Sequence, residues 1–129
     1  MWIRIYYEDT DCGGVVYYAN YLKYFERGRT EFLREKGISL PGLHAEGVVF
    51  VVTKAEVSYI APCRYGELIR VDTRVSSIEG VTMTFEHIVM REDSDDVAVK
   101  GSVILACVNA AGRPVRIPRS LRDALGAVG

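Results

Sequence analysis

Hydrophobic residues recur at helical spacing in the first third of the chain. From about Tyr18–Asn20 to Lys36, just before Gly37, they fall at the i, i+3, i+4 and i+7 positions that place side chains on one face of a helix. These apolar positions are Tyr21, Leu22, Tyr24, Phe25, Phe32 and Leu33. The charged residues Lys23, Arg27, Glu31, Arg34 and Glu35 lie mostly elsewhere on the helix. Gly28 in the middle of a helix costs about 1 kcal/mol relative to Ala, so we expect another backbone to come close there.

After this helix the pattern changes to the two-residue alternation that is typical of strands. Leu68 to Ser77 alternates apolar and polar side chains, which indicates one buried and one solvated face. Strands are predicted over Met1–Tyr7, Val48–Ile60, Leu68–Ser77, Val81–Arg91 and Val97–Asn109, an irregular excursion over Leu40–Gly47, and a short amphipathic helix over Arg119–Leu125. The long strands are expected to be consecutive and antiparallel. The pattern therefore predicts a single α+β domain over residues 1–129, in which an antiparallel sheet covers one hydrophobic helix.

Length and charge narrow the class of protein. The chain has 129 residues, with 16 Lys and Arg against 17 Asp and Glu, and a net charge of −1. A single domain of this size can form a hydrophobic core without disulfides or a bound metal. Its near-neutral net charge gives no general attraction to nucleic acid or anionic lipid. The start of the chain lacks the basic and long apolar segments of a secretory signal. We expect a cytoplasmic protein with no nucleic-acid partner and no membrane insertion.

Candidate catalytic side chains are few. Cys12, Cys63 and Cys107 are an odd number and widely spaced, which argues against a disulfide framework or a zinc knuckle. His44 and His87 have no second ligand at metal spacing, so structural or surface roles are favoured for both. Cys12 as a nucleophile needs a positioned His that the local sequence does not provide. We expect no metal site.

The loop before the helix carries residues that could form a hydrolytic site. Gly13 and Gly14 allow a sharp turn that delivers the chain to the helix, whose first N–H groups carry partial positive charge. Asp11 lies seven residues before Tyr18, so its carboxylate is able to face the space in front of the helix. A carboxylate opposite N–H donors suffices for hydrolysis of a carbonyl compound. The alternative is a solvated turn in which an acidic residue caps the loop, and composition alone favours it.

The same stretch resembles a known family. Tyr6 to Tyr21, followed by Phe25 to Glu31, closely resembles the signature of hotdog-fold acyl-CoA thioesterases of the 4-hydroxybenzoyl-CoA thioesterase/YbgC group. Weaker similarity extends through Tyr59–Glu67 to Arg116–Pro118. The resemblance implies a hotdog fold, with a five-stranded antiparallel sheet wrapped around a long central helix. It also implies a homodimer with active sites at the dimer interface, and usually a homotetramer.

The resemblance also implies roles for particular residues. Asp11 matches the family aspartate that acts as nucleophile or general base on the thioester carbonyl. Tyr18 matches the position whose backbone N–H polarises that carbonyl, and many YbgC-type members have His there. Tyr7 is aromatic in many relatives and either lines the site or packs as a strand aromatic. The implied substrate is an acyl-CoA, hydrolysed to free acid and CoA without a metal or redox cofactor.

Two other functions are compatible with the same residues. One is a non-catalytic module that binds acyl-CoA or acyl carrier protein. The other is a dehydratase or hydratase acting on acyl thioesters. Such an enzyme needs a His paired with a carboxylate, and His87 would have to be that His. The residues that could bind the CoA phosphates are exposed cations, namely Lys54, Arg64, Arg91 and Arg116. For each of them, an ordinary solvated surface charge is the simpler interpretation.

Overall fold

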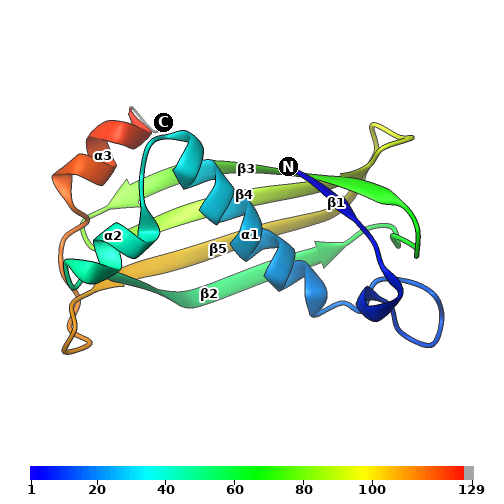
Figure 1. The fold of residues 1–129 in the computed structure, drawn as a ribbon, viewed down its shortest axis with the longest axis horizontal. Coiled ribbons are helices and arrows are strands. Elements are labelled where there is room, and N and C mark those ends of the chain that lie inside the picture. The colour runs from blue at the N-terminus through cyan, green and yellow to red at the C-terminus, as the bar shows by residue number, and fades with distance from the viewer. Residues whose placement is uncertain (127–129) are drawn as a thin grey trace.

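A computed structural model describes residues 1–126, so the last part of the predicted domain, 127–129, lies outside the described residues. Five strands form one antiparallel sheet in the order β1-β3-β4-β5-β2 (Figure 1). The strands are β1 (Trp2–Arg4), β2 (Val49–Tyr59), β3 (Leu68–Glu79), β4 (Thr82–Arg91) and β5 (Val97–Val108). The helices are the short 3-10 helix η1 (Tyr7–Asp9) and the α-helices α1 (Asn20–Glu35), α2 (Leu40–Ala45) and α3 (Arg119–Leu125).

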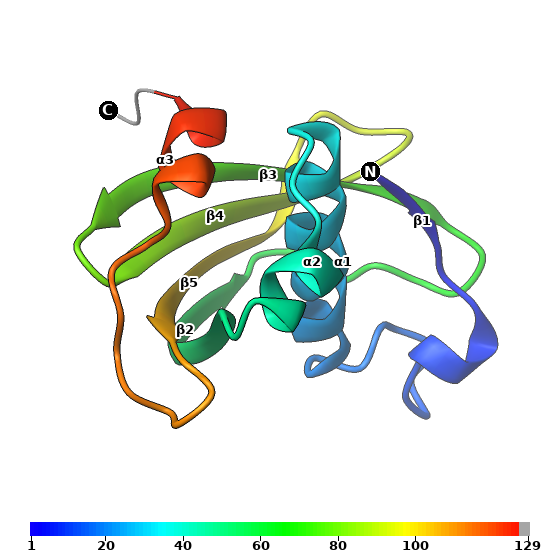
Figure 2. The ribbon, with the colours of Figure 1, turned by 60° about the vertical axis from the view of Figure 1, so that its left-hand side comes forward.

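The sheet curves around α1, which lies against its concave face, while α3 packs near one end (Figure 2). This arrangement confirms the α+β hotdog fold, with a helix of moderate length, 16 residues, rather than a very long one. The helix buries six residues of one face, namely Tyr21, Tyr24, Phe25, Gly28, Arg29 and Leu33. Leu22 does not belong to this face, because its side chain is 43% exposed.

Buried and half-buried residues alternate along β4, so one face of the sheet is buried. Met83, Phe85, His87 and Val89 are fully buried and alternate with half-buried neighbours. Successive side chains of a strand point to opposite faces, so these four line the side that meets α1. Phe25 of the helix stacks on His87, with ring centroids 4.5 Å apart. The core therefore holds one histidine inside an otherwise apolar layer.

Glycines on facing elements let α1 lie close to the sheet. A Cβ at Gly101 in β5 would lie 2.3 Å from the Phe25 ring, so only glycine fits beneath that ring. A Cβ at Gly28 would lie 2.7 Å from Oγ1 of Thr73. The close approach expected at Gly28 is therefore present, but a side chain makes it, and the expectation of a backbone there was wrong.

Three other predictions of local structure need correction. The strand predicted over Met1–Tyr7 ends at Arg4, and η1 follows it. The excursion over Leu40–Gly47 contains α2, whose start is stabilised by the Ser39 hydroxyl accepting from the Gly42 N–H at 3.0 Å, with Pro41 in the first turn. Finally, β2 does not pair with β3, its successor in the chain. It pairs with β5 and forms one edge of the sheet.

Within residues 1–126, no helix is long and apolar enough to span a membrane.

Candidate functional site

Asp11 lies at the tip of a small hairpin that precedes α1. A β-bridge joins Thr10 to Val16, and the N–H of Asp11 donates to the Val15 carbonyl at 2.9 Å. The tip turns through Gly14, whose φ of +77° favours a residue without a side chain. The hairpin is anchored to the body of the protein, because the N–H of Val16 donates to the Cys63 carbonyl at 2.8 Å. The sequence Asp-Cys-Gly-Gly thus forms an ordered turn.

The Asp11 carboxylate is exposed and makes one hydrogen bond within the described residues. Its Oδ1 accepts from the Gly13 N–H at 2.8 Å, the geometry of an Asx turn. The structure thus shows the loop-capping role that was the alternative interpretation of this residue. Because only Oδ1 has a protein donor among residues 1–126, Oδ2 is left to face solvent or a substrate.

Tyr18 does not lie in the helix. The first helical residue is Asn20 and the N-cap is Ala19, so Tyr18 belongs to the preceding turn. The first amides of α1 are already bonded, since the N–H groups of Asn20 and Leu22 donate to the carbonyls of Tyr17 and Ala19 at 2.9 and 3.2 Å. Within the described residues, the N–H groups of Tyr18 and Ala19 have no acceptor. The open donors therefore precede the helix, rather than belonging to its first turn as the sequence pattern predicted.

Both open N–H groups belong to peptide units that are held from their carbonyl side. The carbonyl of Tyr17, which shares a peptide with the N–H of Tyr18, accepts from Asn20. The carbonyl of Tyr18, which shares a peptide with the N–H of Ala19, accepts from the Tyr59 hydroxyl at 3.1 Å. Donors that are fixed before a reaction cost no reorganisation when charge develops beside them. Each of the two open amides is therefore held in place by a hydrogen bond to the carbonyl of its own peptide.

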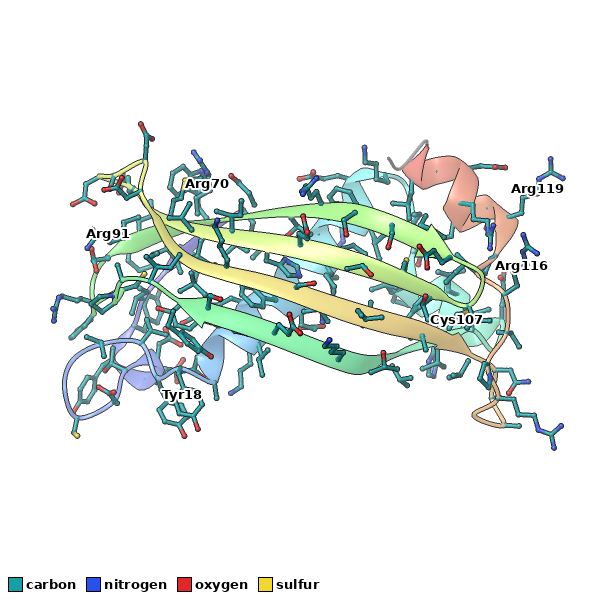
Figure 3. All side chains as sticks on the ribbon, turned by 180° about the vertical axis from the view of Figure 1, so that it is seen from behind. Tyr18, Arg70, Arg91, Cys107, Arg116 and Arg119 are labelled. Carbon is teal, nitrogen blue, oxygen red and sulfur yellow. The ribbon has the colours of Figure 1, made fainter. Side chains whose placement is uncertain are left out.

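Aromatic side chains surround this pair of amides. The Tyr18 ring meets the rings of Tyr17 and Tyr59 at centroid distances of 4.8 and 6.2 Å, and Tyr59 meets Tyr21 at 5.7 Å. Burial raises the pKa of Tyr59, so its phenol stays protonated and remains a donor to the Tyr18 carbonyl. Figure 3 shows Tyr18 beside the end of β2, which carries Tyr59. Local sequence patterns predict no role for Tyr59, because its contact with Tyr18 spans 41 residues.

The structure does not bring Tyr7, Asp11 and Tyr18 into direct contact. Tyr7 is 75% exposed and packs on Tyr65, with ring centroids 5.9 Å apart. Within residues 1–126, Asp11 is hydrogen-bonded to Gly13 and not to Tyr18. What the three share is one continuous segment, folded so that the carboxylate and the open amides lie on the same loop between η1 and α1.

The cations considered for the CoA phosphates occupy different places. Arg64 forms a β-bridge with Val15, so it lies beside the Asp11 hairpin. Lys54 pairs with Glu56 at 2.9 Å on β2. Arg91 lies toward the same end of the sheet as the hairpin, whereas Arg116 lies at the opposite end from Tyr18 (Figure 3). Arg64 is therefore a candidate whose backbone pairs directly with the hairpin that carries Asp11.

A cavity of about 560 Å³ lies between α1, α2 and the first half of β2. Its walls include the apolar side chains of Leu33, Leu40, Phe50, Met83 and Leu105. His44 lies at this cavity and is exposed, so the structure places it away from the hairpin. Cavities of this size are typical of sites for small ligands.

The remaining candidate side chains have structural positions. Cys12 is exposed, whereas Cys63 and Cys107 are buried free thiols, and burial raises the pKa of each of these two. Within residues 1–126, no group of three or more His, Cys, Asp or Glu residues is arranged to hold a metal ion. His87 is 1% exposed and contacts Thr73 and Arg29 rather than a carboxylate. The pairing that a dehydratase needs is therefore missing at His87.

The burial of His87 has a consequence for stability against pH. Burial, with the nearby Arg29 charge, lowers the pKa of His87 to about 3. The unfolded chain binds a proton at this residue near pH 6.5, whereas the folded protein does not, so folding becomes less favourable as pH falls from about 6.5 to 3. We expect His87 to contribute a slope of up to about 1.4 kcal/mol per pH unit in that window.

Denaturant unfolding at several pH values measures this slope. His87→Gln should flatten the acid side of the stability curve, whereas His44→Gln, at an exposed position, should leave the slope as it is in the unaltered protein. Identical slopes for all three proteins would contradict the assignment of a neutral buried imidazole.

Comparison with known proteins shows which family this chain resembles in sequence and structure. Residues 6–125 match the family model described as the thioesterase-like superfamily. The acyl-CoA thioesterase YbgC of Haemophilus influenzae is 40% identical over 124 residues, which cover 95% of this chain and 90% of the relative. The acyl-CoA thioester hydrolase YbgC of Escherichia coli is 38% identical over 120 residues, which cover 92% and 89%. A crystal structure of a probable thioesterase from Bartonella henselae superposes with a TM-score of 0.84 at 36% identity, covering 92% of this chain and 97% of that one.

Proposed function

The chain belongs to the thioesterase-like superfamily and is an acyl-CoA thioester hydrolase, and from this premise we propose that Asp11 and the amides of Tyr18 and Ala19 carry out the hydrolysis. The observation that carries the proposal is the pair of open, fixed N–H groups on the loop that also presents the Asp11 carboxylate. A thioester bound across this loop would place its carbonyl oxygen at the amides and its carbonyl carbon within reach of an attacking oxygen.

The proposed reaction uses only these groups and one water molecule. The Asp11 carboxylate either adds to the carbonyl carbon or takes a proton from a water that adds to it. The carbonyl oxygen becomes an oxyanion, which accepts from the Tyr18 and Ala19 amides. Its collapse breaks the C–S bond and releases the CoA thiolate. Where water was the attacking group, this step yields the free acid directly; where Asp11 attacked, the water hydrolyses the resulting anhydride to the free acid and the Asp11 carboxylate. The reaction needs no metal or redox cofactor, because a thiolate is a good leaving group at neutral pH.

Tyr18 contributes through its backbone in this proposal. Every residue except proline supplies an N–H, so a tyrosine at this position keeps the donor. The phenol ring would border the bound thioester, together with Tyr59. Tyr7, exposed on η1 and stacked on Tyr65, is proposed to contact the more distant part of the substrate.

A panel of short, long and aromatic acyl-CoA substrates, with release of free thiol as the measurement, tests the function. Hydrolysis of at least one class is expected. Tight binding of acyl-CoA with no release of CoA would favour the non-catalytic binding module instead. Single-turnover hydrolysis in oxygen-labelled water tests the nucleophilic role of Asp11, because label enters its carboxylate only when water opens an Asp11 anhydride at the Asp11 carbonyl.

We also propose that the active unit is a homodimer joined through β2, and that dimers associate into tetramers. β2 is an edge strand, and eight of its 11 residues are exposed. Several of the exposed residues at this edge are apolar, including Val51, Val52 and Tyr59 at 41%, 54% and 49% exposure. A long apolar edge strand is a template for pairing with another chain. A second copy that pairs there would cover these side chains and lie beside Tyr18.

A charge placed on this edge should weaken the dimer. We expect Val52→Lys to weaken association by at least about tenfold, because pairing through β2 would bury the added ammonium group among the apolar side chains of the edge. Sedimentation over a range of concentrations measures the effect, and hydrolysis should fall as the dimer dissociates. The control is Trp2→Lys, which changes an exposed aromatic on the opposite edge strand. Unchanged association of the Val52→Lys protein would contradict pairing through β2.

A further inference from the structure

Arg29 is a buried cation without a counter-ion in the described residues. Its side chain extends from the apolar face of α1, one turn from Phe25 and one turn from Leu33, and it is only 9% exposed. Within residues 1–126, no carboxylate lies within ion-pairing distance of it. Arg29 is one of the residues that line the cavity between α1, α2 and β2. A buried charge in this situation is costly unless a partner is supplied.

His87 holds the guanidinium in place. Nη1 of Arg29 lies 3.4 Å from Nε2 of His87, and Nδ1 of His87 lies 3.0 Å from Oγ1 of Thr73. An arginine only donates, so Nε2 must accept and the ring proton must sit on Nδ1, where it is donated to Thr73. The lowered pKa of His87 agrees with this neutral tautomer. His87 is thus a positioning residue, and it uses only one of the five donors of the guanidinium.

Among the other charged groups at the cavity, the Glu26 carboxylate favours the charged form of Arg29 but forms no ion pair with it within residues 1–126. The Glu26 carboxylate also lines the cavity, and its nearest recorded partner is the Thr30 hydroxyl at 3.5 Å. Arg34 lines the cavity as well, and it pairs with Glu31 at 3.2 Å on the exposed side of α1. Burial lowers the pKa of Arg29, yet a guanidinium stays protonated in proteins. The cavity therefore offers a fixed cation with unused donors inside largely apolar walls.

The dimer proposed above connects this cavity to a catalytic loop. The cavity lies against the start of β2, at Val49, Phe50 and Val52, whereas Tyr18 packs on Tyr59 at the end of β2. Antiparallel pairing of two copies of β2 about its midpoint sets the start of one strand beside the end of the other. The cavity of one subunit would then open toward the Tyr18 amide of the partner subunit. An acyl group whose thioester lies at that amide would extend into the cavity.

We propose that Arg29 is a specificity-determining residue that binds an acidic group at the far end of the acyl chain, so that the preferred substrates are ω-carboxyacyl-CoA thioesters. This inference rests on the proposed function, since it assigns the substrate class of the same site. The apolar walls suit the methylene chain, and the guanidinium recognises the terminal carboxylate through its planar, bidentate donors.

The test compares matched substrates that differ only in the terminal group. Adipoyl-CoA is compared with hexanoyl-CoA, and suberoyl-CoA with octanoyl-CoA, by release of CoA thiol. For at least one pair, kcat/KM of the unaltered protein should favour the carboxylated substrate by about 10- to 100-fold, the range expected for a hydrogen-bonded charge pair. Hydrolysis of the plain chains at equal or higher kcat/KM in both pairs would overturn this inference alone. Failure to hydrolyse any acyl-CoA would overturn the proposed function, and this inference with it.

Variants of the same helix separate recognition from folding. Arg29→Gln should abolish the preference for the carboxylated substrate, and Arg29→Lys should keep part of it. The matched control is Arg27→Gln, which removes one positive charge from an exposed position of α1 and should keep the preference. Dissociation of the Arg29→Gln dimer with an unchanged preference would assign the counter-ion to the partner subunit and overturn the inference. The ratio measured on the unaltered protein decides the question even where Arg29→Gln does not fold.

Discussion

Asp11→Asn should lower kcat by about 10²- to 10⁴-fold, the range that removal of a general base or nucleophile usually costs. An amide neither attacks a carbonyl as a carboxylate does nor takes a proton from water. The side-chain oxygen of Asn still accepts from the Gly13 N–H, so the Asx turn at the hairpin tip should persist. Steady-state release of CoA thiol from the best substrate of the panel measures the loss, and thermal unfolding verifies that the fold is kept.

A matched control comes from the same segment. Glu8→Gln also removes one exposed carboxylate three residues away in sequence, in η1, and should retain the activity of the unaltered protein. Wild-type-like turnover of a folded Asp11→Asn protein would remove Asp11 from the chemistry. The open amides of Tyr18 and Ala19 would then have to act with an attacking group from elsewhere.

Gly101→Ala should destabilise the fold by about 1–3 kcal/mol, as expected when a methyl group is forced into a packed core. The added Cβ would lie 2.3 Å from one atom of the Phe25 ring and 2.6 Å from the next, so the ring or the strand must move. That ring is also stacked on His87, which limits how far it moves. Urea unfolding gives the change in free energy directly.

Two further variants distinguish a clash with the Phe25 ring from a general intolerance of β5 to substitution. Ser102→Ala, at the next position on the outer face, should change stability by less than about 0.5 kcal/mol. Combining Gly101→Ala with Phe25→Leu should cost less than the sum of the two single changes, because the smaller side chain gives the new methyl group room. Strict additivity of the two changes would show that the Phe25 ring is not what excludes a side chain at position 101.

Much of the secondary structure could be predicted from local patterns. The buried face of α1, the alternation of Met83 and Phe85 in β4, and the extent of α3 all follow from spacings that repeat within a few residues. The helix α2 was also within reach, since Ser39 and Pro41 are typical of a helix start. It was missed because the glycines that follow suggest a loop.

The candidate site was predicted less completely. The motif places Asp11 and Tyr18 on one loop, but the sequence pattern assigned the free N–H groups to the start of the helix. In the structure the carbonyls of Tyr17, Tyr18 and Ala19 already accept from the first amides of the helix, and the open donors are the N–H groups of Tyr18 and Ala19. Arg29 occupies a position four residues after Phe25 on the apolar face, and that spacing was the available signal for its burial.

The order of apolar and polar residues by itself determined that this chain forms one amphipathic helix and a set of long antiparallel strands, because such periodicity depends on neighbours a few positions apart. The tertiary structure alone decided that β2 lies at the edge beside β5, that Tyr59 holds the peptide after Tyr18, and that His87 meets Arg29. The two side-chain contacts join residues 41 and 58 positions apart. Their geometry depends on how the whole sheet curves around α1, and no local spacing encodes that curvature.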